Sequence, residues 1–191
     1  GFLTTGKDFG SSSIKPINKQ KVAVISGKGT SSLSFGEIWH FFETQLNYPL
    51  TALDTDYINR VDLNKYDVLI IPNGYYSTIL NKSGLEKINN FAQGGGTVIA
   101  IGSALRSFAN KDGFALKSKK SNSSEENSTA NLTSYEDTRR NRANNLITGA
   151  IFRSTVDDSH PMAFGYNNSY FSLKLNNASY EYLQNGNNIA Y

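Results

Sequence analysis

Residues 97–105 read TVIAIGSAL, an apolar run that breaks at Gly102 and Ser103. The pattern predicts a buried strand over 97–101, a sharp turn, and then a helix. Several α/β enzyme families hold a nucleophile above a sheet on such a strand, turn and helix. The stretch therefore favours an α/β fold, and it raises the question of whether any group at the turn can attack a substrate.

The preceding chain alternates strands and helices in the same way. Apolar runs predict strands over 21–26, 49–53 and 66–72, and residues 83–91 read as a helix. Another helix is expected over 35–47, with Ser34 as its N-cap. These lengths are typical of right-handed βαβ units. The expected fold is an open, mostly parallel sheet flanked by helices, of the flavodoxin-like or Rossmann-like type.

The rest of the chain does not continue this alternation of strands and helices. Residues 1–20 are rich in Gly and Ser and read as an interdomain approach segment, so the α/β domain is expected to span 21–191. Residues 110–145 are expected to form a long surface excursion, mobile in its middle, because they offer little to bury. Short β segments are expected over 170–175 and 188–191. The absence of an initial Met and the apolar last residues suggest a piece of a longer polypeptide, with a domain that continues past its final residue.

Composition excludes several classes of function. The chain has 191 residues, 38% of them hydrophobic, enough for one sizeable core and a small second lobe. Its net charge of +3 is scattered, and the basic clusters at 117–120 and 139–142 lack interleaved aromatic residues, so no nucleic acid partner is expected. There is no cysteine, which excludes disulfides, thiolate metal sites and a cysteine nucleophile. No apolar run approaches 18 residues, so no membrane span is expected.

A serine hydrolase would have to use Ser103 as its nucleophile. Its context lacks the second glycine of a Gly-x-Ser-x-Gly elbow, and a serine at a helix start is usually a cap. His160 lies close to carboxylates that could orient an imidazole, whereas His40 lies among core-facing aromatics. Neither histidine belongs to a short zinc motif, so no metal ligands are expected.

The segments that follow the strands are candidates for ligand binding. Gly27, Lys28 and Gly29 follow the first strand in a glycine-rich turn, which matches neither a phosphate loop nor a dinucleotide fingerprint. An ordinary turn between strand and helix is favoured over a nucleotide-binding loop. Because open α/β sheets bind ligands at their carboxyl ends, further candidates follow the later strands. These are Asn73, Gly74, Tyr75, Gly102 and Ser103.

Residues 66–74 and 94–104, taken together, resemble the class I glutamine amidotransferase-like superfamily. In that superfamily the first segment leads to a Pro-Gly-Gly loop that helps to form an oxyanion hole, and the second ends at an elbow that carries cysteine. The resemblance places Gly102 at the nucleophile position and Ser103 directly after it. It also matches Glu37 to an acidic residue that some members place beside the cysteine. No histidine follows the elbow within the next fifty residues.

A resemblance to one kind of amidotransferase-like domain covers nearly the whole chain. Residues 29–32 and 36–43, followed by 149–152 and 158–166, are similar to the C-terminal domain of zinc carboxypeptidase-like proteins of the M14 type from Bacteroidetes-type bacteria. In those secreted proteins the zinc ligands lie in an upstream peptidase domain. The resemblance implies a secreted or periplasmic location and a peptidase domain of the same polypeptide as partner. It also implies no cofactor in this chain, with zinc only in the upstream domain.

Three alternative functions therefore remain open. The first is a non-catalytic accessory domain that supports the peptidase or binds its substrate. The second is a stand-alone module that binds a small molecule or a peptide at the strand ends. The third is a hydrolase that uses Ser103 and His160.

Overall fold

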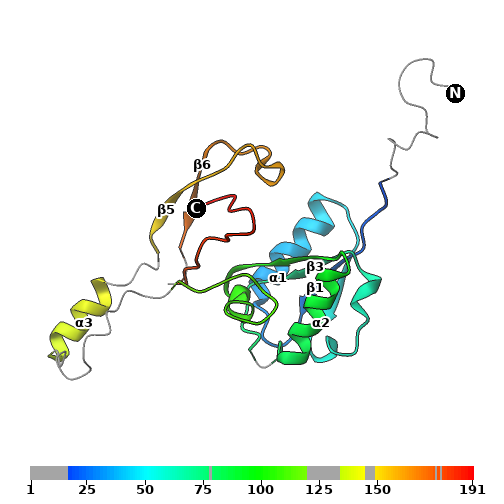
Figure 1. Cartoon of the computed structure of the whole chain (residues 1–191), viewed down its shortest axis with the longest axis horizontal. Helices are drawn as coiled ribbons and strands as arrows, with labels where there is room; N and C mark the ends of the chain where they lie inside the picture. Colours follow the sequence, from blue (N-terminus) through cyan, green and yellow to red (C-terminus); the bar gives the residue numbers. More distant parts are fainter. Residues whose placement is uncertain (1–16, 78, 120–133, 145–148, 175, 177) are drawn as a thin grey trace, which may run out of the picture. The chain divides into compact units, whose positions relative to one another are not determined.

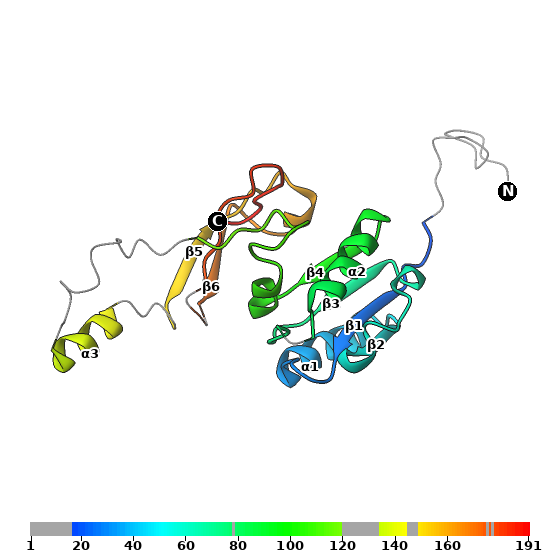
Figure 2. The same ribbon diagram turned by 60° about the horizontal axis from the view of Figure 1, so that its bottom comes forward.

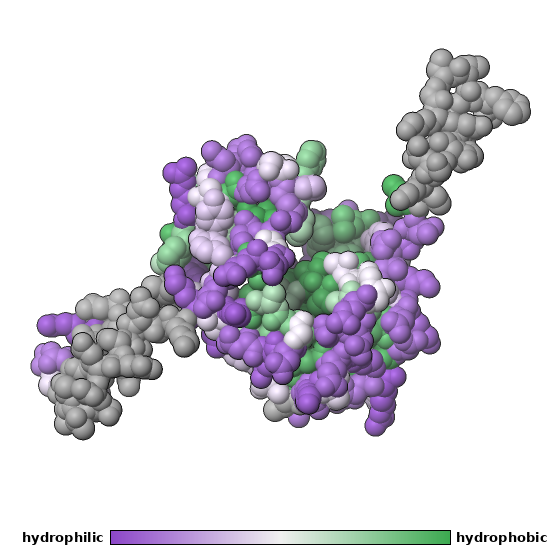
Figure 3. Space-filling view, viewed as in Figure 1, coloured by the Kyte–Doolittle hydropathy of each residue, from purple (hydrophilic) through white to green (hydrophobic). Residues whose placement is uncertain are grey.

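The computed structural model describes residues 17–77, 79–119, 134–144, 149–174, 176 and 178–191. Contacts divide the chain into two compact units, Gly1–Ala104 and Leu105–Tyr191. Each unit is considered separately below. On the face shown in Figure 3, hydrophilic residues cover most of both units, and apolar residues are exposed in smaller patches.

The first unit contains a four-stranded parallel sheet, which confirms the expected α/β fold. The strands are β1 (Val22–Ser26), β2 (Leu50–Asp54), β3 (Val68–Ile71) and β4 (Thr97–Ala100), in the order β2-β1-β3-β4. Residues Val22 to Ile25 of the central strand β1 are all buried, as a strand covered on both faces requires.

Helix α1 (Ser32–His40) covers one face of this sheet. It packs with the following segment against Val22, Val24 and Ile70, using an aromatic and aliphatic stripe of Phe35, Ile38, Trp39 and Phe42. The helix ends in a wide π-helical turn, η1 (Phe41–Gln45), closed by a hydrogen bond from Leu46 N to Phe41 O of 3.0 Å. This turn changes the helical register, and Leu46, which the sequence pattern placed on the core stripe, is 49% exposed.

Helix α2 (Lys82–Gln93) covers the opposite face (Figures 1 and 2). Asn81 caps it by accepting a hydrogen bond from Gly84 N at 3.0 Å, and Ile88 and Phe91 are buried on its inner side. Two short 3-10 helices, η2 (Thr55–Tyr57) and η3 (Leu63–Lys65), lie between β2 and β3. Both helices of the first unit were expected; α2 agrees with the expected 83–91 to within two residues, whereas α1 begins three residues before the expected 35–47 and gives way to η1 after His40.

The second unit contains a small antiparallel hairpin of β5 (Ile151–Thr155) and β6 (Ser169–Leu173). A short 3-10 helix, η5 (Pro161–Ala163), lies between them. Two isolated bridges join distant segments, Ser118 with Tyr180 and Val156 with Ala190. A β portion was expected at 170–175 and 188–191. The hairpin confirms the first segment, and the second contributes only the bridge at Ala190.

The region from 110 to 145 differs from the expected excursion at its end, which forms helix α3 (Tyr135–Asn144). Its sequence has almost no apolar residues, so hydrophobic periodicity could not reveal it. The middle of the expected excursion, 120–133, lies outside the described residues. So does 1–16 of the expected approach segment, whose last four residues are exposed coil.

Two glycine substitutions test the packing of α2 against the sheet. A Cβ at Gly96 would lie 2.3 Å from the Phe91 ring, so Gly96→Ala is expected to destabilise the chain by about 1–3 kcal/mol. Gly36 in α1 has open space around it, and Gly36→Ala is expected to stabilise by about 0.5–1 kcal/mol. Urea unfolding with unchanged m-values measures both. Equal effects of the two changes would contradict the packing described here.

Candidate functional site

The candidate site lies where the carboxyl ends of the parallel strands meet. Strands β2 and β3 lie on opposite sides of β1. The connection after β1 leads to β2 on one side, and the connection after β3 leads to β4 on the other, so the two connections run in opposite directions. Open α/β sheets bind ligands at such a switch point. The sequence-predicted residues Gly27, Lys28 and Gly29 follow β1, while Asn73, Gly74 and Tyr75 follow β3, and Gly102 and Ser103 follow β4. The structure thus brings all of them to one edge of the sheet.

The loops after β1 and β3 are joined by main-chain hydrogen bonds. Ser31 N donates to Asn73 O at 2.9 Å, and Tyr75 N donates to Gly29 O at 2.8 Å. The approach is so close that a Cβ at Gly74 would lie 2.3 Å from Gly29 O. Only glycine fits at this position. The N–H of Ser31, the residue before α1, is therefore hydrogen-bonded within the protein and is not free to bind an anion.

Ser34 joins this network in place of the helix-capping role predicted for it. The prediction was wrong because Ser34 Oγ accepts a hydrogen bond from Asn73 N at 3.0 Å. Ser31 is the N-cap instead, and its side chain accepts from Ser34 N at 3.5 Å. The helix therefore begins three residues earlier than the sequence pattern indicates.

The turn after β4 has the backbone geometry of an elbow. Gly102 has a φ of +59°, a region that residues with a side chain adopt only at a cost. A Cβ on Gly102 would also lie 2.8 Å from Asn73 Oδ1. Both observations explain why glycine occupies the turn, and any nucleophilic side chain there would have to displace the Asn73 amide.

The amide that follows the turn is already hydrogen-bonded. Ser103 N donates to Asn73 Oδ1 at 2.8 Å. In a nucleophile elbow the N–H of the residue after the nucleophile stabilises the oxyanion of the reaction intermediate. Here a neutral amide oxygen from the β3 loop takes that hydrogen bond, so the donor is not available to a substrate while Asn73 holds this position.

Ser103 itself is only 8% exposed and is the second residue of the 3-10 helix η4 (Gly102–Ser107). The prediction that it caps an α-helix was wrong, because the chain forms a 3-10 turn with Ala104 N bonded to Ile101 O at 3.2 Å. A buried hydroxyl behind an exposed Gly102 is poorly placed to meet a substrate.

Tyr76 belongs to the site, although only its neighbour Tyr75 was among the predicted ligand-binding residues. Its side chain is 1% exposed, whereas the neighbouring Tyr75 is 71% exposed. The Tyr76 hydroxyl donates to Pro72 O at 2.9 Å and lies 3.2 Å from Thr30 Oγ1, so it joins the loops after β1 and β3. Burial raises the pKa of Tyr76 above its ordinary value, and the hydrogen bond with Thr30 opposes this rise in part. The tyrosine pair was visible in the sequence, but not which member is buried.

Several of the predicted ligand residues remain open to solvent. Lys28 and Tyr75 have exposed side chains, and the backbone at Gly27, Gly29 and Gly102 is exposed as well. This part of the edge offers one ammonium group, one phenol ring and bare main chain to a ligand.

His160 belongs to the second unit, whereas Ser103 belongs to the first. His160 Nδ1 accepts a hydrogen bond from Met162 N at 3.2 Å and caps η5, and His160 Nε2 lies 3.0 Å from the side-chain amide of Asn187. Both ring nitrogens are thus engaged locally.

The neighbouring Asp157 does not orient the His160 ring as a triad carboxylate would. Asp157 Oδ1 accepts hydrogen bonds from Ser159 Oγ at 2.6 Å and from Ser159 N at 3.2 Å. These bonds, with the His160 charge as a lesser cause, lower the pKa of Asp157. His40, the other histidine, is exposed at the end of α1 and contacts Thr44 Oγ1 at 3.3 Å.

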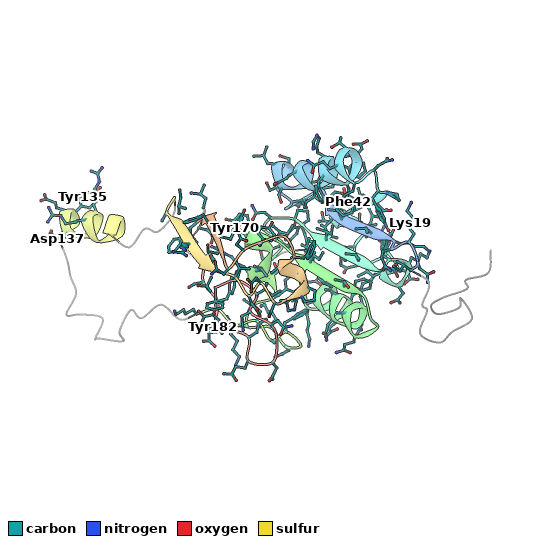
Figure 4. All side chains as sticks on the ribbon, turned by 90° about the horizontal axis from the view of Figure 1, so that it is seen from above. Lys19, Phe42, Tyr135, Asp137, Tyr170 and Tyr182 are labelled. Atoms are coloured by element: carbon teal, nitrogen blue, oxygen red, sulfur yellow. The ribbon has the colours of Figure 1, made fainter. Side chains whose placement is uncertain are left out.

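Two open cavities lie elsewhere on the first unit. One, of about 320 Å³, is lined by polar residues of η3 and α2, including Asp62, Glu86 and Lys87. The other, of about 450 Å³, lies at the amino ends of β1 and β2 and includes Lys19, labelled in Figure 4, and Tyr48. The Lys19 ammonium lies 5.2 Å from the centre of the Tyr48 ring.

Metal and membrane features were searched among the described residues alone. Within them, no group of three or more His, Asp or Glu side chains is placed to hold a metal ion. Within the same residues, no helix combines the length and the apolar character needed to cross a bilayer.

The pKa of Tyr76 leads to a prediction for alkaline solution. The pKa of Tyr76 is higher in the folded chain than its ordinary value of 10.0. This difference contributes fully to the stability of the fold below pH 10.0, and the contribution is lost as the pH rises through the folded-state pKa. Tyr76→Phe is therefore expected to reduce the fall in unfolding free energy above about pH 10. Burial also raises the pKa of Tyr180, so part of the fall persists. Urea unfolding at pH 8 to 11.5 measures the slope, and an unchanged slope would refute the assignment.

A double-mutant cycle tests the contact at the elbow. Gly102→Cys is expected to cost about 2–4 kcal/mol, because it combines an unfavourable φ with displacement of the Asn73 amide. In an Asn73→Gly background the displacement disappears, so the same change should cost about 1 kcal/mol less. Unfolding free energies of the four proteins give the coupling. Strictly additive costs would show that the Asn73 side chain does not occupy the elbow.

Comparisons with known proteins agree with the fold. No protein-family profile matches the sequence, and no curated protein matches it significantly. Among solved structures, the chain is similar to a glutamine amidotransferase from Thermotoga maritima, with a TM-score of 0.59 and 9% sequence identity. The match covers 91% of this chain and 67% of that protein. At this identity the likeness concerns the fold alone, and the chain has a class I glutamine amidotransferase-like α/β fold.

Proposed function

We propose that this chain is a non-catalytic domain built on the amidotransferase-like fold. The observation that carries the proposal is the elbow itself. Gly102 provides no nucleophile at the turn, and Asn73 Oδ1 accepts the hydrogen bond of the amide that an oxyanion would need. The scaffold of a catalytic elbow is present, while the two groups that would do the chemistry are absent or engaged.

We propose more specifically that this chain is an accessory domain of a secreted zinc carboxypeptidase-like protein of the M14 type. It is supported by the resemblance to such domains of residues 29–32, 36–43, 149–152 and 158–166. The partner is then an upstream peptidase domain of the same polypeptide, which holds the zinc. The location is secreted or periplasmic, and the domain supports the peptidase or binds its substrate.

A second function is a module that binds a small molecule or a peptide at the switch point. The exposed Lys28 and Tyr75 favour it, because they stand beside bare main chain at the edge where α/β sheets hold ligands.

Hydrolysis by Ser103 is the weakest of the three functions. The serine is buried, its amide is bonded to Asn73, and both nitrogens of His160 are engaged in the second unit.

Activity and ligand screens on the purified chain separate these functions. We expect no hydrolysis of glutamine, ester or peptide substrates above a buffer control, and no difference between the wild-type chain and Ser103→Ala. Hydrolysis that Ser103→Ala abolishes would overturn the non-catalytic proposal. Thermal-shift screens with amino acids, peptides and sugars test the module, since a ligand at a hundred times its Kd stabilises by about 2.7 kcal/mol. A shift that Lys28→Ala or Tyr75→Ala removes would favour the module over an accessory role.

A further inference from the structure

The cavity at the amino ends of β1 and β2 carries two opposite charges that do not pair with each other. Its volume is about 450 Å³, and the Lys19 ammonium and the Glu43 carboxylate both line it. In the described part of the chain, neither group forms an ion pair with any residue. The cavity thus offers one uncompensated positive charge and one uncompensated negative charge to a ligand.

An aromatic neighbour holds each of these charged groups in place. Trp39 Nε1 donates a hydrogen bond to Glu43 Oε2 at 2.8 Å, and the Lys19 ammonium lies 5.2 Å from the centre of the Tyr48 ring. The Tyr48 hydroxyl is fixed in turn, because it donates to Gln20 O at 2.6 Å. Both charges are therefore oriented before a ligand arrives, which lowers the entropy lost on binding.

The π-helical turn η1 supplies the acidic side of the cavity. Trp39 and Glu43 are four residues apart across the junction of α1 and η1, so they face the same way. The indole engages only Oε2, which leaves Glu43 Oε1 without a partner in the described part of the chain. Wide turns of this kind within helices occur frequently at functional sites.

The remaining walls are mainly apolar. Pro49 and Leu50 line the cavity beside the two rings. One face of each ring is already covered, since Trp39 stacks on Phe35 at 5.8 Å and the Lys19 ammonium lies over Tyr48. The cavity is therefore better suited to a ligand with charged ends and an apolar body than to a sugar that stacks on an aromatic ring.

We propose that this cavity binds a zwitterionic amino compound, which is an amino acid or a short peptide with both termini free. Its carboxylate pairs with the Lys19 ammonium, and its ammonium pairs with Glu43 Oε1. An apolar side chain of the ligand packs against Pro49 and Leu50. The proposal goes beyond the proposed function and does not rest on it, because the candidate site lies at the opposite, carboxyl ends of the strands.

The fluorescence of Trp39 measures occupancy directly, because the chain has one tryptophan. The probes are leucine and the dipeptide alanyl-leucine, which place the two charges at different separations. We expect at least one of them to change the fluorescence of the full 191-residue chain saturably, with a Kd of about 1 mM, because exposed charge pairs bind weakly. The tighter probe indicates the length of the ligand.

Capped forms of the tighter probe test each charge on the wild-type chain, so this comparison does not depend on the folding of any variant. N-acetylation removes the ammonium that pairs with Glu43, and amidation removes the carboxylate that pairs with Lys19. Each cap is expected to weaken binding about fivefold.

Two substitutions test the protein side of the same pairs. Lys19→Met keeps an unbranched apolar side chain without the charge, and Glu43→Gln keeps an oxygen that can accept from Trp39 Nε1. Each is expected to weaken binding of the free probe about fivefold. Lys19→Met should bind the free and amidated probes equally, and Glu43→Gln should bind the free and acetylated probes equally, as double-mutant cycles require.

Matched controls make the same changes of charge away from the cavity. Lys65 and Glu86 are exposed on η3 and α2. Lys65→Met and Glu86→Gln are therefore expected to leave the Kd of the free probe unchanged.

Three results would overturn the proposal. The first is no saturable change of fluorescence with either probe. The second is equal affinity of the wild-type chain for the free and the capped forms. The third is binding of an uncharged hexose such as glucose that is as tight as that of the free probe, because the two charges would then not select the ligand.

Discussion

Asn73 makes hydrogen bonds to three residues in two separate segments, and the carboxyl edge of the sheet depends on them. Its N–H donates to Ser34 in α1, its main-chain oxygen accepts from Ser31 before that helix, and its side-chain oxygen accepts from Ser103 after β4. One residue in the β3 loop therefore fixes the start of a helix on one side and the turn of the elbow on the other. Removing its side-chain amide would leave Ser103 N without a partner at a partly buried position, which is costly.

The same residue determines what the elbow can do. A turn with a positive φ after a parallel strand is the geometry with which enzymes expose a nucleophile, and here it is occupied by glycine. Recovering a catalytic site would require a side chain at Gly102 and a smaller residue at Asn73 together, since either change alone meets a clash or leaves a donor unpaired. The residues at positions 73 and 102 are therefore constrained together by the geometry of the turn.

The sequence predicted the parts of this structure that depend on local pattern. Continuous apolar runs predicted the four parallel strands, and the break at Gly102 predicted the elbow. The burial predicted for 97–101 was wrong, because β4 is an edge strand in which Ile99 is 44% exposed. The helix start was misplaced because Ser34 bonds to an amide 39 residues away, a relation that no local pattern contains. The link between Asn73 and Ser103 was missed for the same reason, since it spans 30 residues. Helix α3 escaped notice because its sequence has almost no apolar residues and therefore no hydrophobic periodicity.

The long-range pairing of the second unit sets an order of folding during synthesis. Every partner in the parallel sheet precedes Ala104, so this sheet can close once that part of the chain has left the ribosome. The bridges of Ser118 with Tyr180 and of Val156 with Ala190 have to wait for Tyr180 and Ala190, which are translated several seconds after Ala104. Until then Val156 lacks the partner that follows β5, so the second unit closes only after the first unit is complete.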